Sequence, residues 1–485
     1  MKICFIPIDN RPVCYNLAVD IVSLDKSIDF YIPPREFLGD LIKNADVNTI
    51  LDWLKNIPKC DAIILSLDTI AYGGLIPSRR SCESFEEIKD RIEQLKQILK
   101  EKDAKIYAFS SIMRISNNNY NEEEKEYWKD YGKKIFEYSF LKHKNKENGI
   151  TPPQPSPSRE GEDYVNPSQP TPSREGDDTI TPTQTNLDIP QEILDDYLAT
   201  RKRNFEINKL YLQWQKEGLF DTLIFSKDDC AEFGFNVEEA KELEKLGGRT
   251  KTGADEIPLS LLSRSIKKDI KVFVEFTEPD CKDLISNYED VSIEKSVLGQ
   301  LELGGFKTVT TQKDADLILI VNNFREKQGE LVMRWKTGKR GKYKFIKPNK
   351  PFCIADVRYA NGADNEFVEQ ILPHINSENF YGYSAWNTSA NTLGSILAGA
   401  KIKFNANNYA NNYAEKSFKK LQTIRFLDDW AYQANVREKI EYPSKIEDLM
   451  KPYEEKVFNA LDYKPSRNIE YTYPWDRKFE IEIQI

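Results

Sequence analysis

Eight apolar, strand-like runs in this chain are each followed within a few residues by acidic, amide or arginine side chains. The runs are residues 2–8, 61–67, 105–109 and 221–225 in the first half and 271–276, 314–321, 351–355 and 379–383 in the second. Open α/β sheets bind ligands just beyond the carboxyl ends of their strands. The pattern therefore predicts a site in which carboxylates move protons while amides and guanidinium groups bind a substrate.

The carboxylates proposed for catalysis all follow strand-like runs of the first half: Asp9, Asp68, Asp228 and Asp229. Adjacent carboxylates such as Asp228 and Asp229 point in different directions, so one can donate a proton or orient the substrate while the other holds it. Asp9 and Asp68 would assist them. A structural alternative stays open, in which Asp229 caps the helix expected near Asn236.

The substrate-binding candidates combine cations, a carboxylate, amides and one indole: Arg11, Arg79, Arg114, Asp356, Asn361, Trp386 and Asn387. A guanidinium group suits a carboxylate, a phosphate or a buried aspartate. Carboxylates and amides suit the hydroxyls of a sugar, and an indole suits its apolar face. The same oxygens would suit a divalent cation, so the cofactor stays open. Helix capping by Asn387 and Thr388 is the structural alternative.

Histidine and glycine-rich motifs are nearly missing from the chain. Only His143 and His374 occur, so catalytic triads and histidine-rich zinc sites lack their residues. The seven cysteines are scattered and form no C-x-x-C pair, which argues against a disulfide framework or a zinc finger. No strand is followed by a phosphate-binding glycine motif. Chemistry then falls to carboxylates, Arg, Lys, Tyr or an oxygen-bound metal.

Composition indicates a globular protein with more than one core, since its 485 residues are 40% hydrophobic and 12% aromatic. A net charge of −9 with both signs mixed along the chain argues against a nucleic-acid partner. No apolar run approaches the ~20 residues that cross a bilayer, and no signal peptide precedes the first strand. We therefore expect a small-molecule substrate, no membrane partner and a cytoplasmic location. The oligomeric state stays open.

Strands and helices alternate along both halves of the chain. Strands are expected near residues 3–8, 28–32, 62–66, 105–110 and 222–226, and again near 272–276, 306–309, 316–321, 352–356 and 380–384. This alternation predicts parallel sheets covered by helices. Five strands per half, with a short second strand, favour two flavodoxin-like (Rossmann-like) α/β domains of strand order 2-1-3-4-5. A single (β/α)8 barrel is the alternative.

The predicted domains are residues 1–265 and 266–400. A mostly helical C-terminal extension, residues 401–485, is expected to end in a strand over 478–485 and to pack back across the domains. Within the first domain, the apolar stretch Ser66–Arg80 contains a double glycine and is expected to be a long loop.

Residues 150–185 repeat with a period of 15, as in Ile150–Gln154, Val165–Gln169 and Ile180–Gln184. Proline, serine and charge at this density cannot bury a core, so we expect a disordered insertion over about residues 145–187. Deleting it, by joining Asn148 to Asn186, should leave the melting temperature and activity unchanged. Loss of folding, or a change in turnover beyond about tenfold, would show that the insertion is a working part of the protein.

Six short motifs together resemble the bacterial family catalogued as domain of unknown function 4127. They are Pro7–Pro12, Leu67–Gly74 with Ser78-Arg79, Asp228-Asp229, Gly253–Glu256, Asp356 with Asn361-Gly362, and Trp386–Thr388 with Asn391–Gly394. The resemblance covers nearly the whole chain apart from the repeats. It implies that these motifs belong to one type of protein, and it assigns no activity.

Three functions are compatible with these residues. The first is an enzyme that hydrolyses a carbohydrate or polyol-like small molecule, with paired carboxylates in a cleft between the domains. The second is a carboxylate-metal-dependent isomerase or sugar transferase. The third is a non-catalytic solute-binding protein, because paired α/β domains also clamp ligands without chemistry.

Overall fold

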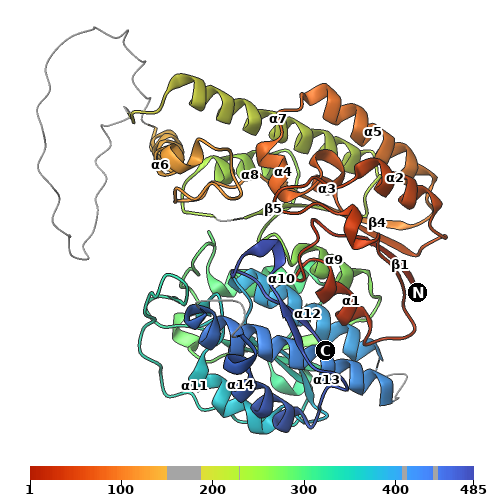
Figure 1. Ribbon diagram of the computed structural model, residues 1–485, viewed down its shortest axis with the longest axis vertical. Helices are drawn as coiled ribbons and strands as arrows, with labels where there is room; N and C mark the ends of the chain where they lie inside the picture. The colour runs from red at the N-terminus through yellow and green to blue at the C-terminus, as the bar shows by residue number, and fades with distance from the viewer. Residues whose placement is uncertain (150–186, 229, 407–411, 441–445) are drawn as a thin grey trace, which may run out of the picture.

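Two parallel β-sheets organise the chain, one in each half (Figure 1). The computed structural model describes residues 1–149, 187–228, 230–406, 412–440 and 446–485. The first sheet has the order β2-β1-β3-β4-β5-β6 and contains β1 (Lys2–Ile6), β2 (Asp29–Tyr31), β3 (Ala62–Ser66), β4 (Lys105–Ile112), β5 (Thr222–Lys227) and β6 (Thr250–Thr252). The second has the order β8-β7-β9-β11-β13 and contains β7 (Lys271–Phe276), β8 (Lys307–Thr308), β9 (Leu317–Asn322), β11 (Phe352–Asp356) and β13 (Phe380–Ser384).

Both sheets follow the predicted flavodoxin-like order 2-1-3-4-5, and neither closes into a barrel within the residues described. The prediction of two α/β domains is therefore confirmed. The central strands form for a simple reason: β3 and β9 are apolar runs whose residues are all buried. Such continuous runs belong in a parallel sheet that helices cover on both faces. The short strand β6 extends the first sheet and was not predicted.

The helices of the first domain are α1 (Asn16–Val22), α2 (Val47–Asn56), α3 (Leu67–Tyr72), α4 (Leu75–Arg80), α5 (Phe85–Glu101), α6 (Trp128–Glu147), α7 (Gln191–Lys216), α8 (Phe235–Lys245) and α9 (Ile257–Ser265). Those of the second are α10 (Ile293–Leu303), α11 (Asn365–Ile371) and α12 (Ser389–Ala406). A capping box between Ser84 and Glu87 starts α5. The predicted disordered insertion, between α6 and α7, lies outside the described residues except at its ends.

The stretch Ser66–Arg80 is helical, so the prediction of a long loop is wrong. It forms α3 and α4, which Gly73 and Gly74 separate. Gly73 has φ +89°, and a Cβ there would lie 2.8 Å from Asn44 Cβ, so the break needs glycine. The apolar residues showed no helical period because every residue of α3 is buried.

The two domains share apolar packing. Helix α9 contacts β3 and β4 of the first sheet as well as α12 of the second domain. The buried side chain of Glu256, just before α9, fills the space beside two glycines: a Cβ on Gly253 would meet its carboxylate, and one on Gly394 of α12 would meet its Cγ. One continuous hydrophobic cluster therefore includes side chains from both sheets.

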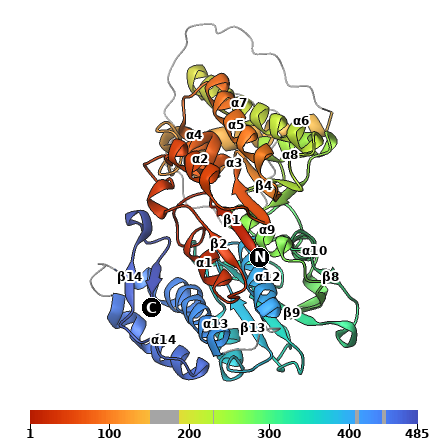
Figure 2. The ribbon, with the colours of Figure 1, turned by 90° about the vertical axis from the view of Figure 1, so that its right-hand side faces the viewer.

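The C-terminal extension packs on the second domain and reaches the first (Figure 2). It contains α13 (Asn412–Arg425), the π-helical segment η6 (Phe426–Val436), α14 (Ile446–Leu461) and the hairpin of β14 (Glu470–Thr472) with β15 (Glu482–Gln484). Glu482 of β15 accepts hydrogen bonds from Asn16 (3.0 Å) and Arg35 (2.7 Å) of the first domain. The predicted return of the chain end across the domains is therefore observed.

Candidate functional site

A cavity of about 450 Å³ lies between the domains, beyond the carboxyl ends of β1, β4 and β5. Its wall includes Asp9, Arg11, Arg114, Glu123, Asp228 and Asp255 of the first domain, Tyr288, Asn361, Asn387 and Thr388 of the second, and Trp475, Arg477 and Phe479 of the C-terminal extension. Three separate parts of the chain therefore contribute side chains to a single cavity. We call it the interdomain cavity.

Arg11 is the centre of a buried ionic cluster on this wall. Its Nη2 lies 2.8 Å from Asp9 Oδ2 and 2.6 Å from Asp255 Oδ1, and its Nη1 lies 3.1 Å from Glu480 Oε1. The ring of Trp475 covers the guanidinium group, with 5.1 Å between the ring centroid and Cζ. One guanidinium group thus faces three carboxylates. With all three carboxyl groups ionised the cluster has an excess of negative charge, and each proton that a carboxyl group takes up reduces that excess.

Burial raises the pKa values of two carboxyl groups in this cluster. It raises the pKa of Glu480 to about 7, with Arg11 opposing the shift and Asp255 adding to it. It also raises the pKa of Asp255, where Arg11 again opposes the shift and the charges of Asp9 and Asp228 add to it. Because Asp255 lines the cavity, the cluster can present a proton at the cavity wall.

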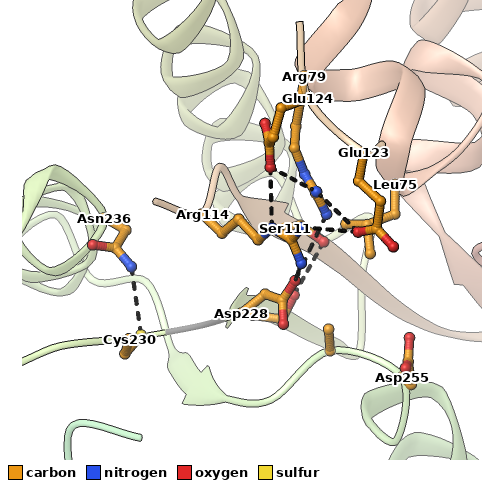
Figure 3. Close-up of polar contacts among 12 residues, drawn as sticks. Leu75, Arg79, Ser111, Arg114, Glu123, Glu124, Asp228, Cys230, Asn236 and Asp255 are labelled. Carbon is orange, nitrogen blue, oxygen red and sulfur yellow. Dashed lines mark hydrogen bonds and ion pairs between the residues drawn. The ribbon is translucent and has the colours of Figure 1, made fainter. Parts of the chain in front are cut away.

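Asp228 faces two arginines on another part of the wall (Figure 3). Its Oδ2 lies 3.4 Å from Arg114 Nη1 and 3.7 Å from Arg79 Nη2. Both arginines also bind Glu124 Oε1, at 3.2 Å from Arg114 Nε and 3.0 Å from Arg79 Nη1. The side chain of Arg79 is 1% exposed, whereas that of Asp228 is 23% exposed. Asp228 is therefore the accessible end of a fixed network.

Glu123 connects this network to the C-terminal extension. Its Oε2 lies 2.9 Å from Arg114 Nη2, and its Oε1 lies 2.6 Å from Arg477 Nη1. Although burial opposes the shift, Arg114, Arg79 and Arg477 hold the pKa of Glu123 well below its usual value. The ionised carboxylate consequently fixes Arg477 at the cavity wall.

The backbone of the extension is unusual where it meets the cavity. Trp475 and Asp476 have φ values of +57° and +54°, a left-handed conformation that costs free energy in residues other than glycine. Two contacts hold it: Trp475 Nε1 donates to Asn10 Oδ1 at 2.8 Å, and Arg477 stacks on the Trp475 ring at 4.7 Å. The indole is thereby held at the cavity wall.

The four proposed catalytic carboxylates separate into three groups. Asp9 and Asp228 line the cavity. Asp68 is buried in α3 and is not part of the wall; its Oδ2 accepts a hydrogen bond from Ser111 N at 2.8 Å, and burial raises its pKa to about 7. Asp229 lies outside the described residues.

The substrate-binding candidates of the second domain also separate. Asn361 and Asn387 line the cavity with φ values of +61° and +53°, and Asn361 N donates to Asn387 O at 2.8 Å. Asp356 instead lies buried at the end of β11, where it accepts hydrogen bonds from Asn322 (2.7 Å) and Tyr383 (2.9 Å) and ties three strand ends together. Burial raises the pKa of Asp356 to about 6.

Trp386 is buried against Phe479, with 6.0 Å between the ring centroids, and is not part of the cavity wall. Of the arginine candidates, Arg11 and Arg114 line the cavity, whereas Arg79 lies behind Arg114 in the same network. Asp356, Trp386 and Arg79 therefore support the wall rather than form it.

Several wall residues were not among the predicted site residues: Glu123, Asp255, Trp475, Arg477 and Phe479. The acidic run Glu122–Glu124 follows the fourth strand and could have indicated the first. Asp255 follows β6, a short strand that was not predicted. Trp475 follows β14, a three-residue strand that was not among the predicted strands, so a rule based on the predicted strand ends does not find it.

The acidic side chains of the described residues form no group of three or more metal-ligating residues that could hold a cation. In the interdomain cavity, the Arg11 guanidinium group occupies the centre of the acidic cluster. Among the described helices, none is both long and apolar enough to cross a bilayer.

Several buried carboxyl groups predict that acid stabilises the fold. Burial raises the pKa of Glu256 to about 8 and that of Asp68, Glu289 and Asp429 to about 7. Unfolded carboxyl groups titrate near ~4, so between about pH 5 and pH 7 the folded protein binds more protons than the unfolded chain. Its free energy of unfolding should therefore fall as the pH rises through this range.

The urea midpoint, measured at about pH 5.5 and pH 7, checks the direction of this change in stability. Glu256→Gln should reduce the change in midpoint between the two pH values. The window ends near pH 7 because the buried Lys403, whose pKa burial lowers to about 7, acts with the opposite sign above it. A midpoint that rises from about pH 5.5 to pH 7 would contradict the prediction.

The fold and the cavity define a class: an α/β protein of two flavodoxin-like domains with a charged cavity between them, completed by the C-terminal extension. The chain belongs to the family described as protein of unknown function (DUF4127), whose model matches residues 3–168 and 168–484. No curated protein and no solved structure matches the chain.

Proposed function

We propose that the protein is a hydrolase that acts on a carbohydrate or polyol-like small molecule bound in the interdomain cavity. One observation carries the proposal: carboxylates from different strand ends, Asp9 and Asp228, line the same cavity as amide and aromatic side chains. Glycosidic hydrolysis uses a pair of carboxyl groups that flank the bond to be broken.

The roles follow from exposure and charge. Asp228 is accessible and would act as a base on water or as a nucleophile at the bond to be broken. Asp255, in the Arg11 cluster, would supply the proton that the leaving oxygen takes up. Water contributes the hydroxyl group to one product and restores the proton, so the reaction consumes no further reactant.

The remaining wall suits a polyhydroxylated ligand. The side chains of Asn361 and Asn387 offer amide groups from the second domain. Trp475 and Phe479 offer aromatic surface from the C-terminal extension, and aromatic rings bind the apolar faces of sugars. The arginines of the wall are already paired with carboxylates, which favours a neutral ligand over a strongly anionic one.

A thermal-shift screen tests the proposal. A panel of neutral sugars, amino sugars and phosphorylated sugars should contain a ligand that raises the melting temperature, because a ligand at 100-fold its Kd stabilises the fold by about 2.7 kcal/mol. Oligosaccharides of that ligand should then be cleaved, as product analysis would show. Binding without cleavage would favour the solute-binding alternative, and a ligand that binds only with a divalent cation would favour the isomerase or transferase.

A further inference from the structure

The segment that leads from β9 to β11 differs in charge from the rest of the chain. Residues 325–350 contain ten Lys and Arg residues but only Glu326 and Glu330 as acids, a net charge of +8. Since the whole chain carries −9, all other residues together carry −17. The expectation that both signs are mixed throughout fails in this segment, which we call the basic loop. It is the blue-green loop at the left edge of the lower domain in Figure 1.

The inward side of the basic loop is firmly attached to the second domain. Arg340 pairs with Asp364, and its Nη1 donates to Asn322 Oδ1 at 3.2 Å. Tyr343 OH donates to Glu275 at 2.8 Å. The ring of Phe345 packs on those of Phe352 and Phe367. These contacts fix the backbone, and between Lys342 and Ile346 exposed residues alternate with the partly buried Tyr343 and Phe345.

The outward side carries cations that the protein itself does not neutralise. Six lysines of the loop are exposed and form no ion pair with the described residues: Lys327, Lys336, Lys339, Lys342, Lys344 and Lys347. Large apolar side chains are exposed among them, with exposed fractions of 53% for Met333, 48% for Trp335 and 80% for Ile346. Neighbouring lysines repel one another, and exposed apolar side chains are unfavourable in water. A surface that combines the two is typical of a binding site.

We propose that the basic loop docks on the surface of a bilayer that contains anionic phospholipid. Each Lys or Arg near such a surface contributes about 1 kcal/mol, and clusters of four to eight are typical of such contacts. Tryptophan prefers the interface between lipid and water. The phosphates of a nucleic acid would pair with the lysines but would leave Met333 and Ile346 exposed to water. The apolar residues therefore favour a bilayer.

The charge of the remaining chain sets the orientation of this contact. A net −17 outside the loop repels an anionic surface, so the basic loop should be the part that makes contact. The contact requires no membrane-spanning helix. Glu330, a buried residue of the basic loop, accepts a hydrogen bond from the side chain of Asn361, which lines the interdomain cavity. This hydrogen bond links the basic loop to the wall of the cavity, although the proposal does not depend on what the cavity binds.

Vesicle co-sedimentation of the full chain tests the proposal. The protein should bind vesicles of phosphatidylglycerol and phosphatidylcholine but not vesicles of phosphatidylcholine alone, and added salt should weaken the binding. Replacing Lys336, Lys339, Lys342 and Lys344 with Gln should lower the affinity about 100-fold or more. The matched control replaces Lys100, Lys202, Lys216 and Lys245, which are exposed on the first domain, and should bind as the original protein does although its net charge is the same as that of the loop variant.

Trp335→Ala separates a bilayer from a purely electrostatic partner. It should weaken vesicle binding about tenfold with no change in melting temperature, because the indole contacts lipid rather than the core. Three results would overturn the proposal: no binding to anionic vesicles, an equal loss in the two lysine variants, or binding to RNA or heparin that outcompetes the vesicles and is indifferent to Trp335→Ala.

Discussion

Asp228→Asn is expected to lower kcat by about 10²–10⁴-fold on the substrate that the ligand screen identifies. Asn keeps the size of the side chain and can still contact Arg114, but it can neither accept a proton nor attack carbon. KM should change little, because Asp228 is one contact among many in the wall. Steady-state kinetics together with the melting temperature would show whether chemistry or folding has changed.

Asp283→Asn provides the control, since Asp283 is exposed, has the same change in charge and is not part of the cavity wall. It should leave kcat, KM and the melting temperature unaltered. If Asp228→Asn also leaves kcat unaltered, Asp228 has no part in the chemistry. The proposed function would then need another accessible carboxylate, and none of the buried members of the Arg11 cluster has comparable exposure.

The strand order could be predicted because each central strand appears in the sequence as a continuous apolar run. β3, β9 and β11 are apolar up to their last residue and buried throughout, as is typical of a parallel sheet covered on both faces. Elements that do not form such an apolar run were predicted wrongly or not at all. α3 is short and buried on every side, so its residues show no helical period, and β6 is a three-residue edge strand.

The candidate site was predictable only in part, because a strand end gives the position of a residue but not the direction of its side chain. Asp9, Arg114 and Asp228 follow β1, β4 and β5 and do line the cavity. Asp356 ends β11 in the same way, yet it turns into a hydrogen-bond network with Asn322 and Tyr383. That difference depends on tertiary packing.

The C-terminal part of the site depends on contacts between distant parts of the sequence. Trp475 meets Asn10, and Arg477 meets Glu123, across hundreds of residues. No local pattern encodes such pairs, because each residue alone is compatible with an exposed chain end. The pairs become visible only when the extension returns over the first domain.

Arg11→Met is expected to destabilise the protein by about 3–5 kcal/mol, the usual cost of removing one partner from a buried ionic group. Arg11 is 7% exposed and is the cation that Asp9, Asp255 and Glu480 share within 3.1 Å. Met removes the cation but leaves Asp9 and Asp255 buried without this counter-charge, and leaves Glu480 with only Arg477, whose Nη2 lies 4.0 Å away. The urea midpoint at neutral pH measures the loss.

Two further measurements distinguish lost charge from lost packing. Arg249→Met removes an arginine from an exposed pair with Glu302, at 2.8 Å, and should cost no more than about 0.5 kcal/mol. The loss in Arg11→Met should also shrink as the pH falls towards about 5, because protonated carboxyl groups no longer need a cation. Burial already raises the pKa of Glu480 to about 7 in the presence of Arg11, and removing that cation can only raise it further. A loss that stays constant with pH would mean that Arg11 stabilises the fold by packing, and the Arg11 cluster could then not be the source of the proton proposed for catalysis.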